Sequence, residues 1–291
     1  MAEITASLVK ELRDKTNCGM MDCKAALKES GGNLEEAETI LRKKGIASAD
    51  KKAARAAKEG VIASRISEDG KTGILVEVNC ETDFVAKNEN FTSFVDEILD
   101  HISSNGSAGS VEELLQEDHG GTTLEEFVKA KVGELGENLV VQRFSRFALD
   151  GDGSVGSYIH LAGKVGVLIE VKSASADAAG NDDFKTLVKD LCLHIAAAHP
   201  SAITREEVPS DQVEAEKDIY REQMKDKPEN VIEKIITGKI DKFYSQIALL
   251  EQGFVKDPDQ TIKQLIESKG KDLGGDLTIS RFERYAVGEE A

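Results

Sequence analysis

Residues 60–78, GVIASRISEDGKTGILVEV, and residues 153–171, GSVGSYIHLAGKVGVLIEV, are two versions of one stretch of sequence. When the chain is aligned with itself, Gly73 meets Gly166, a shift of 166 − 73 = 93 residues, and the match continues without a gap from 60 to 102. In both versions, apolar and β-branched residues flank a Gly-Lys turn, which predicts a β-hairpin. A match of this length indicates an internally duplicated fold.

Each copy continues beyond its hairpin in the same order. A helical pattern begins near Phe91 in the first copy and near Phe184 in the second, and each copy then ends in a strand pattern. These strands, NLVVQRFSRFAL at 138–149 and DLTISRFERYAV at 276–287, align at a shift of 276 − 138 = 138 residues. This order of elements predicts an α+β fold whose core is a duplicated pair of related subdomains.

The two shifts differ by 138 − 93 = 45, so about 45 residues have entered the second copy before its closing strand. Segment 205–250 supplies them. It contains two amphipathic helical patterns separated by a break at Lys227 and Pro228, which predicts an inserted antiparallel helical hairpin. This hairpin would either cover the second subdomain or act as a contact arm for a partner protein or a second copy of the chain.

Residues 5–45 carry the pattern of three short helices. Apolar residues recur at helical spacing in each of them, namely Leu8 and Leu12, Met21 and Ala25, and Leu34, Ala37 and Leu41. Gly19 separates the first two helices, and Gly45 is expected to close the third. A module of this size has a small core and suits docking better than catalysis. Met20 and Met21 would either pack inside it or form an adaptable apolar contact surface.

Positive charge is concentrated between Arg42 and Lys58, where seven basic residues accompany one acidic residue, Asp50. The chain as a whole is acidic, because 37 Lys and Arg stand against 54 Asp and Glu, a formal net charge of −17. Nucleic-acid binding relies on clustered positive charge, so the overall balance argues against it. We interpret the basic stretch as a solvated helical linker, with RNA association as the weaker alternative.

The composition also indicates a compartment. No run approaches the ~18–20 apolar residues that span a bilayer, and the first residues, MAEITASLVKELRDKTN, lack the apolar core of a signal peptide. The four cysteines, Cys18, Cys23, Cys80 and Cys192, form no CxxC pair and are expected to be reduced thiols. We therefore expect a cytoplasmic protein that does not enter the membrane.

These patterns divide the 291 residues into four parts. Residues 1–55 would form the three-helix module and its linker, and residues 56–149 core subdomain 1. Core subdomain 2 would comprise residues 150–204 and 251–291, and the helical hairpin residues 205–250.

The duplication separates residues that the shared fold needs from residues that serve one copy. The loop after the second strand reads Glu81-Thr82-Asp83-Phe84-Val85-Ala86-Lys87 in the first copy and Ala174-Ser175-Ala176-Asp177-Ala178-Ala179-Gly180 in the second. Phe84 therefore aligns with Asp177, so the fold does not need an aromatic residue there. We interpret Phe84 as an exposed wedge at a contact site, since exposed apolar loop residues mark such sites.

Two kinds of histidine emerge from the same comparison. His101 and His194 are equivalent and are expected to be structural, whereas His160 aligns with Ser67 and is a candidate contact residue of the second copy.

No motif in the chain predicts catalysis. Gly151-Asp152-Gly153-Ser154-Val155-Gly156 has the GxGxxG spacing, but a strand pattern follows it where dinucleotide binding requires a helix. The five histidines lack metal-ligand spacing, and no nucleophile elbow is present. We therefore expect a non-enzymatic binding protein without a cofactor, a metal or a nucleotide site of its own.

Three segments closely resemble the bacterial elongation factor Ts family. They are ITASLVKELRDKTNCGMMDCKAALKES at 4–30, ETDFVAK at 81–87 and SYIHLAGKVGVLIEV at 157–171, in the order that the family has them. The resemblance implies a guanine-nucleotide exchange factor for elongation factor Tu in protein biosynthesis. It also implies that the N-terminal module has a ubiquitin-associated-like three-helix fold.

The resemblance assigns roles to particular residues. Thr82, Asp83, Phe84 and Val85 match the family loop that intrudes near the partner's nucleotide and magnesium. Arg13, Met20 and Met21 match positions that hold a helix of the partner's nucleotide domain, and His160 lies in the motif that grips another partner domain. The alternative function is a non-enzymatic binding or chaperone-like protein without exchange activity.

Overall fold

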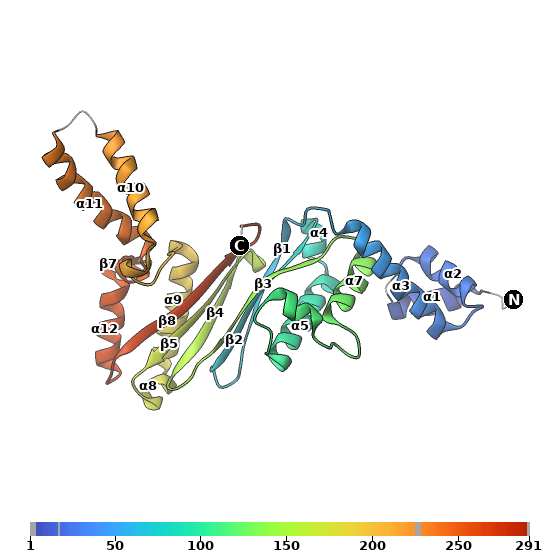
Figure 1. Cartoon of the computed structure of the whole chain (residues 1–291). Helices are drawn as coiled ribbons and strands as arrows, with labels where there is room; N and C mark the ends of the chain where they lie inside the picture. Colours follow the sequence, from blue (N-terminus) through green and yellow to red (C-terminus); the bar gives the residue numbers. More distant parts are fainter. Residues whose placement is uncertain (1–3, 17, 225–227, 290–291) are drawn as a thin grey trace.

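The computed structural model describes residues 4–16, 18–224 and 228–289. The molecule is elongated, with a helical module at one end, a helical hairpin at the other and two antiparallel sheets between them (Figure 1). The sheets are antiparallel, and helices pack on each of them as well as forming the two ends of the molecule, so the predicted α+β class is confirmed.

The module at the N-terminal end consists of three helices, α1 (Ala6–Thr16), α2 (Met20–Glu29) and α3 (Leu34–Lys52). Its small core contains Val9, Leu12, Cys23, Ala26, Leu27, Ala37 and Leu41. The Asn33 side chain caps α3, because its Oδ1 accepts hydrogen bonds from the backbone N–H groups of Glu35 and Glu36.

The expectation that Gly45 ends the third helix is wrong, because α3 continues to Lys52. Helix α7 (Leu124–Leu135) lies against α3 at this point, and a Cβ placed on Gly133 would be only 2.6 Å from the Cα of Gly45. The glycine therefore permits two helix backbones to approach closely instead of closing a helix. The stretch from Arg42 to Lys52 is packed helix, and a linker is confined to the residues between Lys52 and the first strand.

The predicted apolar face of the second helix is also wrong. α2 buries Cys23, Ala26 and Leu27, whereas Met21 and Ala25 are exposed. The buried residues follow the i, i+3, i+4 spacing that places side chains on one helix face. The helix face that contains Cys23 packs against the core of the module, so Met20 and Met21, at the start of the helix, are exposed to solvent.

Each copy of the repeat forms its own three-stranded antiparallel sheet. The sheet of the first copy has the order β1-β2-β3, with β1 (Glu59–Ile66), β2 (Thr72–Cys80) and β3 (Val140–Ala148). The sheet of the second has the order β4-β5-β8, with β4 (Gly153–His160), β5 (Val165–Ser173) and β8 (Leu277–Ala286). Both hairpins and both closing strands are confirmed. The register slips at equivalent places, between Glu77 and Val78 and between Glu170 and Val171.

The helices of the two copies correspond as well. A short turn of helix follows the second strand, as α4 (Asp83–Ala86) and α8 (Ala176–Gly180), and a long helix covers the sheet, as α5 (Glu89–Asn105) and α9 (Asp182–Ala198). The repeat extends further than sequence identity shows. α7 and α12 (Ile262–Asp272) begin at N-caps 138 residues apart, Thr123 and Thr261, and both precede the closing strand.

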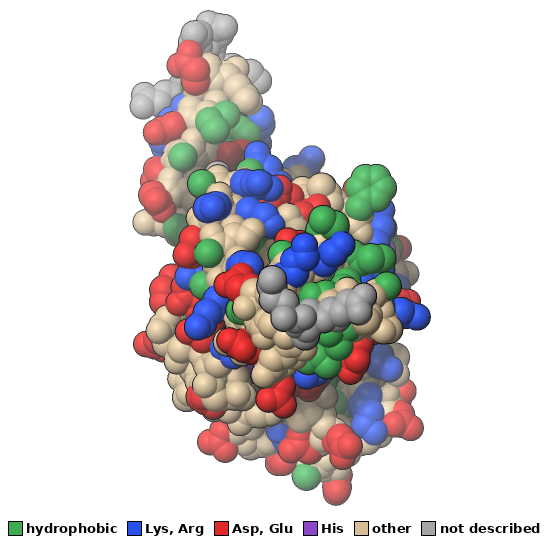
Figure 2. All heavy atoms as spheres, turned by 90° about the vertical axis from the view of Figure 1, so that its right-hand side faces the viewer, with side chains coloured by type: hydrophobic (Ala, Val, Ile, Leu, Met, Phe, Trp, Pro, Cys, Tyr) green, Lys and Arg blue, Asp and Glu red, His purple; other side chains and the backbone are tan. Residues whose placement is uncertain are grey.

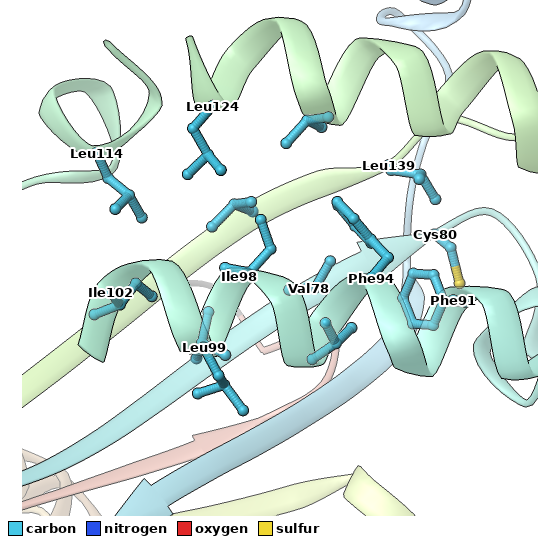
Figure 3. Packing of buried hydrophobic residues seen from close by; sticks show 14 of the residues in the cluster. Val78, Cys80, Phe91, Phe94, Ile98, Leu99, Ile102, Leu114, Leu124 and Leu139 are labelled. Carbon is cyan, nitrogen blue, oxygen red and sulfur yellow. The ribbon is translucent and has the colours of Figure 1, made fainter. Parts of the chain in front are cut away.

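The core of the first copy lies between its sheet and the helices α5 and α7 (Figure 3). Phe91 and Phe94 of α5 are fully buried, beside Val78 of β2. Leu114 of α6 (Val111–Gln116) and Leu124 of α7 complete the core on the other side. This packing fixes the end of β2, from which the loop with Phe84 departs.

The two sheets pack against each other through a separate apolar cluster. Its buried members are Ile62, Leu75, Phe147, Leu149, Val155, Leu168 and Tyr285. Gly73 and Gly166 stand at the closest approaches: a Cβ on Gly73 would lie 2.4 Å from Val155 Cγ1, and one on Gly166 would lie 2.3 Å from Ile62 Cγ2. The identical glycines in the two copies are therefore explained by the contact that each makes with the other copy.

The inserted hairpin consists of α10 (Ser210–Gln223) and α11 (Glu229–Ile247), which run side by side away from the second sheet (Figure 1). The predicted break at Pro228 precedes α11, whereas Lys227 lies outside the described residues. The hairpin has its own apolar cluster, to which Val213, Met224, Ile236 and Ile240 belong. Short elements connect it to the second copy, namely η2 (Arg205–Glu207), η3 (Leu249–Glu251), β6 (Gly253–Phe254) and β7 (Asp257–Thr261).

Over residues 4–16, 18–224 and 228–289, no helix combines the length and the apolar content that a membrane crossing requires.

Candidate partner-binding surface

Phe84 projects from the single-turn helix α4. The residue is 82% exposed, the largest exposed fraction among the large hydrophobic residues of the described chain. Its neighbours face the other way: Ala86 is buried in the core of the first copy, and Val85 packs against that core. The turn is therefore anchored from below while its aromatic side chain stands in solvent, which is an unfavourable position unless a partner covers it.

Polar contacts define both ends of this turn. The Thr82 hydroxyl accepts a hydrogen bond from the Val85 N–H at 3.4 Å and caps α4. Asp83 pairs with Lys87 at 2.8 Å, and the hydrogen bond from Lys87 lowers the pKa of the Asp83 carboxyl. The Cys80 thiol donates to the carbonyl oxygen of Thr82 at 3.2 Å. Because burial raises the pKa of this thiol to about 11, it remains a protonated donor at neutral pH.

The N-terminal module carries the second group of candidate residues. Met20 and Met21, the first two residues of α2, are 59% and 76% exposed, and Arg13 of α1 is exposed as well. Neither methionine packs in the core of the module, so the interpretation that they pack inside it is wrong, whereas the contact surface stays a prediction. Figure 2 views this end of the molecule: hydrophobic and basic side chains lie side by side in the upper half, and acidic side chains are more frequent toward the bottom.

The third group lies at the hairpin turn between β4 and β5. His160 is exposed at the end of β4, and its Nδ1 lies 2.9 Å from the Tyr158 hydroxyl. The two residues that follow, Leu161 and Ala162, have left-handed backbone with φ of 50° and 51°. Leu161 is 65% exposed. Left-handed backbone costs a residue with a Cβ roughly 1–2 kcal/mol, so this turn holds an apolar side chain outward in a strained conformation.

Sequence reasoning missed Leu161. Its equivalent in the first copy is Glu68, since 161 − 93 = 68, and that turn is polar: the Ser67 hydroxyl donates to Asp69, which also accepts from the Lys71 N–H. The change from an acidic residue to leucine at a hairpin tip was the available signal.

The structure does not gather all the candidate residues into one pocket. Arg13, Met20 and Met21 share the module, whereas α4 and the turn after His160 both lie against β1. Lys164, just beyond that turn, pairs with Glu59 at the start of β1 at 2.6 Å. The candidate residues thus lie at three separate points on elements that pack into one elongated body.

The described residues contain no group of three or more His, Cys, Asp or Glu side chains placed to hold a metal ion. Exposed apolar residues on anchored elements at three separate points define a class of protein: a binding factor that holds its partner over an extended surface.

Comparisons with known proteins specify the class further. Residues 81–289 match the family model described as "Elongation factor TS". The chain is 46% identical to the elongation factor Ts of Trichlorobacter lovleyi over 291 residues, which covers 98% of this chain and 93% of that protein. The identity is also 46%, with the same coverage, to the elongation factor Ts of Clostridium botulinum strain Eklund 17B and to that of a Nitratiruptor species. The chain belongs to the elongation factor Ts family.

Proposed function

We propose that this protein is the guanine-nucleotide exchange factor of elongation factor Tu and promotes the release of GDP during translation elongation. The observation that carries the proposal is Phe84, a large apolar side chain that is 82% exposed on a turn whose neighbouring residues are anchored in the core. Family membership supports the identity of the partner. The wedge would enter the region of the partner that holds the nucleotide and its magnesium, together with Thr82, Asp83 and Val85.

Exchange of this kind requires no catalytic base. A factor accelerates release when it binds the nucleotide-free partner more tightly than the nucleotide-bound partner, and linkage makes the effect reciprocal. Burying one Phe side chain is worth roughly 1.5–3 kcal/mol, which corresponds to about 10- to 150-fold in an equilibrium. Phe84 alone would therefore supply part of the acceleration, and the grip on the rest of the partner would supply the remainder.

The other two contact points would provide that grip. Arg13, Met20 and Met21 would hold a helix of the partner's nucleotide domain, and the exposed turn at His160 would hold another partner domain. These roles would be distributed over the four parts that the sequence indicates. They are a ubiquitin-associated-like module at 1–55, core subdomains at 56–149 and at 150–204 with 251–291, and the hairpin at 205–250. Such a factor would act in the cytoplasm.

The reciprocity of linkage gives a direct test. The affinity of this protein for elongation factor Tu is measured by calorimetry, once with the partner stripped of nucleotide and once with saturating GDP. The proposal predicts that GDP weakens the complex by the same factor by which this protein weakens GDP binding. Equal affinity in both states would support the alternative, a binding or chaperone-like protein without exchange activity.

A further inference from the structure

Glu137 reaches from the start of the closing strand to the loop that carries Phe84. It lies between α7 and β3, and one oxygen of its carboxylate, Oε2, accepts hydrogen bonds from the N–H groups of Glu81 and Thr82 at 3.0 and 2.9 Å. The other oxygen, Oε1, accepts from the Thr82 hydroxyl at 2.6 Å. All three donors lie in the two residues immediately before α4.

The carboxylate of Glu81 makes the reverse connection, from the loop to the residue that follows Glu137. Glu81 Oε1 accepts from the backbone N–H of Asn138 at 2.7 Å and from Arg55 Nη1 at 3.3 Å. The buried side chain of Asn138 donates to the carbonyl oxygen of Arg55 at 2.9 Å. The loop is thus joined both to the closing strand and to the segment that leaves the N-terminal module. Hydrogen bonds to charged groups are the stronger ones, so this is a firm attachment.

The second copy shows that the fold itself does not need Glu137. Its equivalent there is Gly275, since 137 + 138 = 275, and a Cβ on that glycine would lie 2.4 Å from the Cβ of Ala174, the equivalent of Glu81. The helical turn nevertheless forms, because Ser175 Oγ accepts from the N–H three residues on at 3.3 Å, as Thr82 does in the first copy. The cap is common to both copies, whereas the Glu137 attachment occurs only in the copy that carries the exposed aromatic residue.

We propose that Glu137 is a positioning residue that fixes the direction in which Phe84 projects. This inference rests on the proposed exchange function. A side chain that is already held in its bound orientation loses less conformational freedom when the partner is engaged, and rigid support of this kind strengthens an interaction without touching the partner. Removing Glu137 leaves Phe84 in place but lets its turn reorient.

Steady-state and saturation kinetics of GDP release separate positioning from general damage. Glu137→Ala is predicted to lower the maximal release rate about tenfold, because the hydrogen bonds to the charged carboxylate are lost. The half-saturating concentration of the factor should stay unchanged. Glu137→Gln keeps the shape but has a single acceptor oxygen, so a smaller loss is expected. Glu134→Ala is the matched control, because that carboxylate lies one turn earlier, in α7, and pairs with Lys131. It should behave as wild type.

A double-mutant cycle distinguishes a role in positioning Phe84 from a general role in stability. In a Phe84→Ala background, Glu137→Ala should have no further effect on the release rate, because there is no longer a wedge to position. Equal losses with and without Phe84, or a wild-type rate for Glu137→Ala, would overturn the proposal.

Amide hydrogen exchange of the free protein tests the attachment independently of the partner. Glu137→Ala should accelerate exchange at the N–H groups of Glu81 and Thr82, while protection in β2 and α5 remains as in wild type. If the wild-type protein failed to accelerate GDP release from elongation factor Tu, the proposed function would fail and the positioning role with it, whatever the amides showed. If the wild-type protein accelerated GDP release and these amides exchanged equally in wild type and Glu137→Ala, the positioning role alone would be refuted.

Discussion

The hydroxyl oxygens of Ser64 and Ser157 lie 3.0 Å apart. The two serines occupy the same position in the two copies of the repeat, since 64 + 93 = 157. Two equivalent positions can touch each other only close to the axis that exchanges the copies. The pair of serines therefore marks a pseudo-two-fold axis between the sheets.

Contacts away from the axis occur in reciprocal pairs. Arg143 stacks on the ring of Tyr285 and donates to the carbonyl oxygen of Ala286. Its equivalent in the second copy, Arg281, stacks on the ring of Phe147 and donates to the carbonyl oxygen of Ala148. Both guanidinium groups lie 4.2 Å from the ring centroid. Each arginine also pairs with a buried glutamate of its own sheet, Glu77 in the first copy and Glu170 in the second. The two copies thus meet as the subunits of an isologous dimer do.

This interface predicts the effect of enlarging Gly73. Valine favours strands, so propensity alone would make Gly73→Val stabilising. The new side chain would instead collide with Val155 and Leu168 of the other copy, and overpacking of this kind costs about 1–3 kcal/mol. Denaturant unfolding should show this loss, and Gly166→Val should show a similar one.

Gly238→Ala is the control for that experiment. Gly238 lies in α11 with open space around it, and alanine there should be neutral or stabilising by up to about 1 kcal/mol. Unchanged stability of Gly73→Val would mean that the copies do not pack as described.

Phe84→Ala should lower the rate of GDP release from elongation factor Tu by about 10- to 150-fold without abolishing it, because the burial of one aromatic side chain is lost. The free energy of unfolding should change by less than about 0.5 kcal/mol, since the side chain is exposed in the free protein. Stopped-flow fluorescence and thermal unfolding measure the two effects. A wild-type release rate would show that Phe84 is not the wedge.

Leu161→Gly should separate stability from binding. Glycine adopts the left-handed backbone of residue 161 without strain, and after its own entropic cost the protein should gain roughly 0.5–1 kcal/mol. The complex with elongation factor Tu should weaken about tenfold, because an exposed apolar contact is removed. Titration calorimetry of the complex, together with unfolding of the free variant, decides the matter. Unchanged affinity would remove Leu161 from the contact surface.

His194 predicts a loss of stability in acid. Burial lowers the pKa of this histidine below its ordinary value of 6.5, and its neutral ring bridges Gln252 and the N–H of Val255. The unfolded chain therefore binds a proton more readily than the folded one below about pH 6.5. The stabilising contribution is complete above that pH and is lost as the pH falls through the lower pKa of the folded state.

Thermal unfolding between pH 7.5 and 5 measures this dependence. His194→Gln, which cannot take up a proton, should reduce the slope of stability against pH. Part of the slope should persist, because burial also lowers the pKa of His119 in the first copy. An identical slope in variant and wild type would show that His194 does not contribute.

The duplicated sheets were predictable from the sequence because both copies retain the residues that the shared fold requires. Gly73 and Gly166 are identical for the reason that each packs against the other copy, and a self-alignment exposes such residues directly. The exposure of Phe84 followed from its replacement by Asp177 in the second copy.

Features that depend on partners distant in the chain could not be inferred in this way. Gly45 has the sequence signature of a helix end, but the helix that lies against it is 88 residues further on, since 133 − 45 = 88. The equivalence of α7 and α12 was hidden because only their caps and spacing are retained. Glu137 is one acidic residue among 54 Asp and Glu, and only the fold shows that it contacts Thr82.

The rate of GDP release decides whether this protein is an exchange factor. Elongation factor Tu is loaded with a fluorescent GDP analogue, excess unlabelled GDP is added, and release is followed by stopped flow with and without this protein. We predict acceleration by several orders of magnitude that saturates with the concentration of the factor. An unchanged release rate, with complex formation demonstrated on a sizing column, would contradict the exchange function.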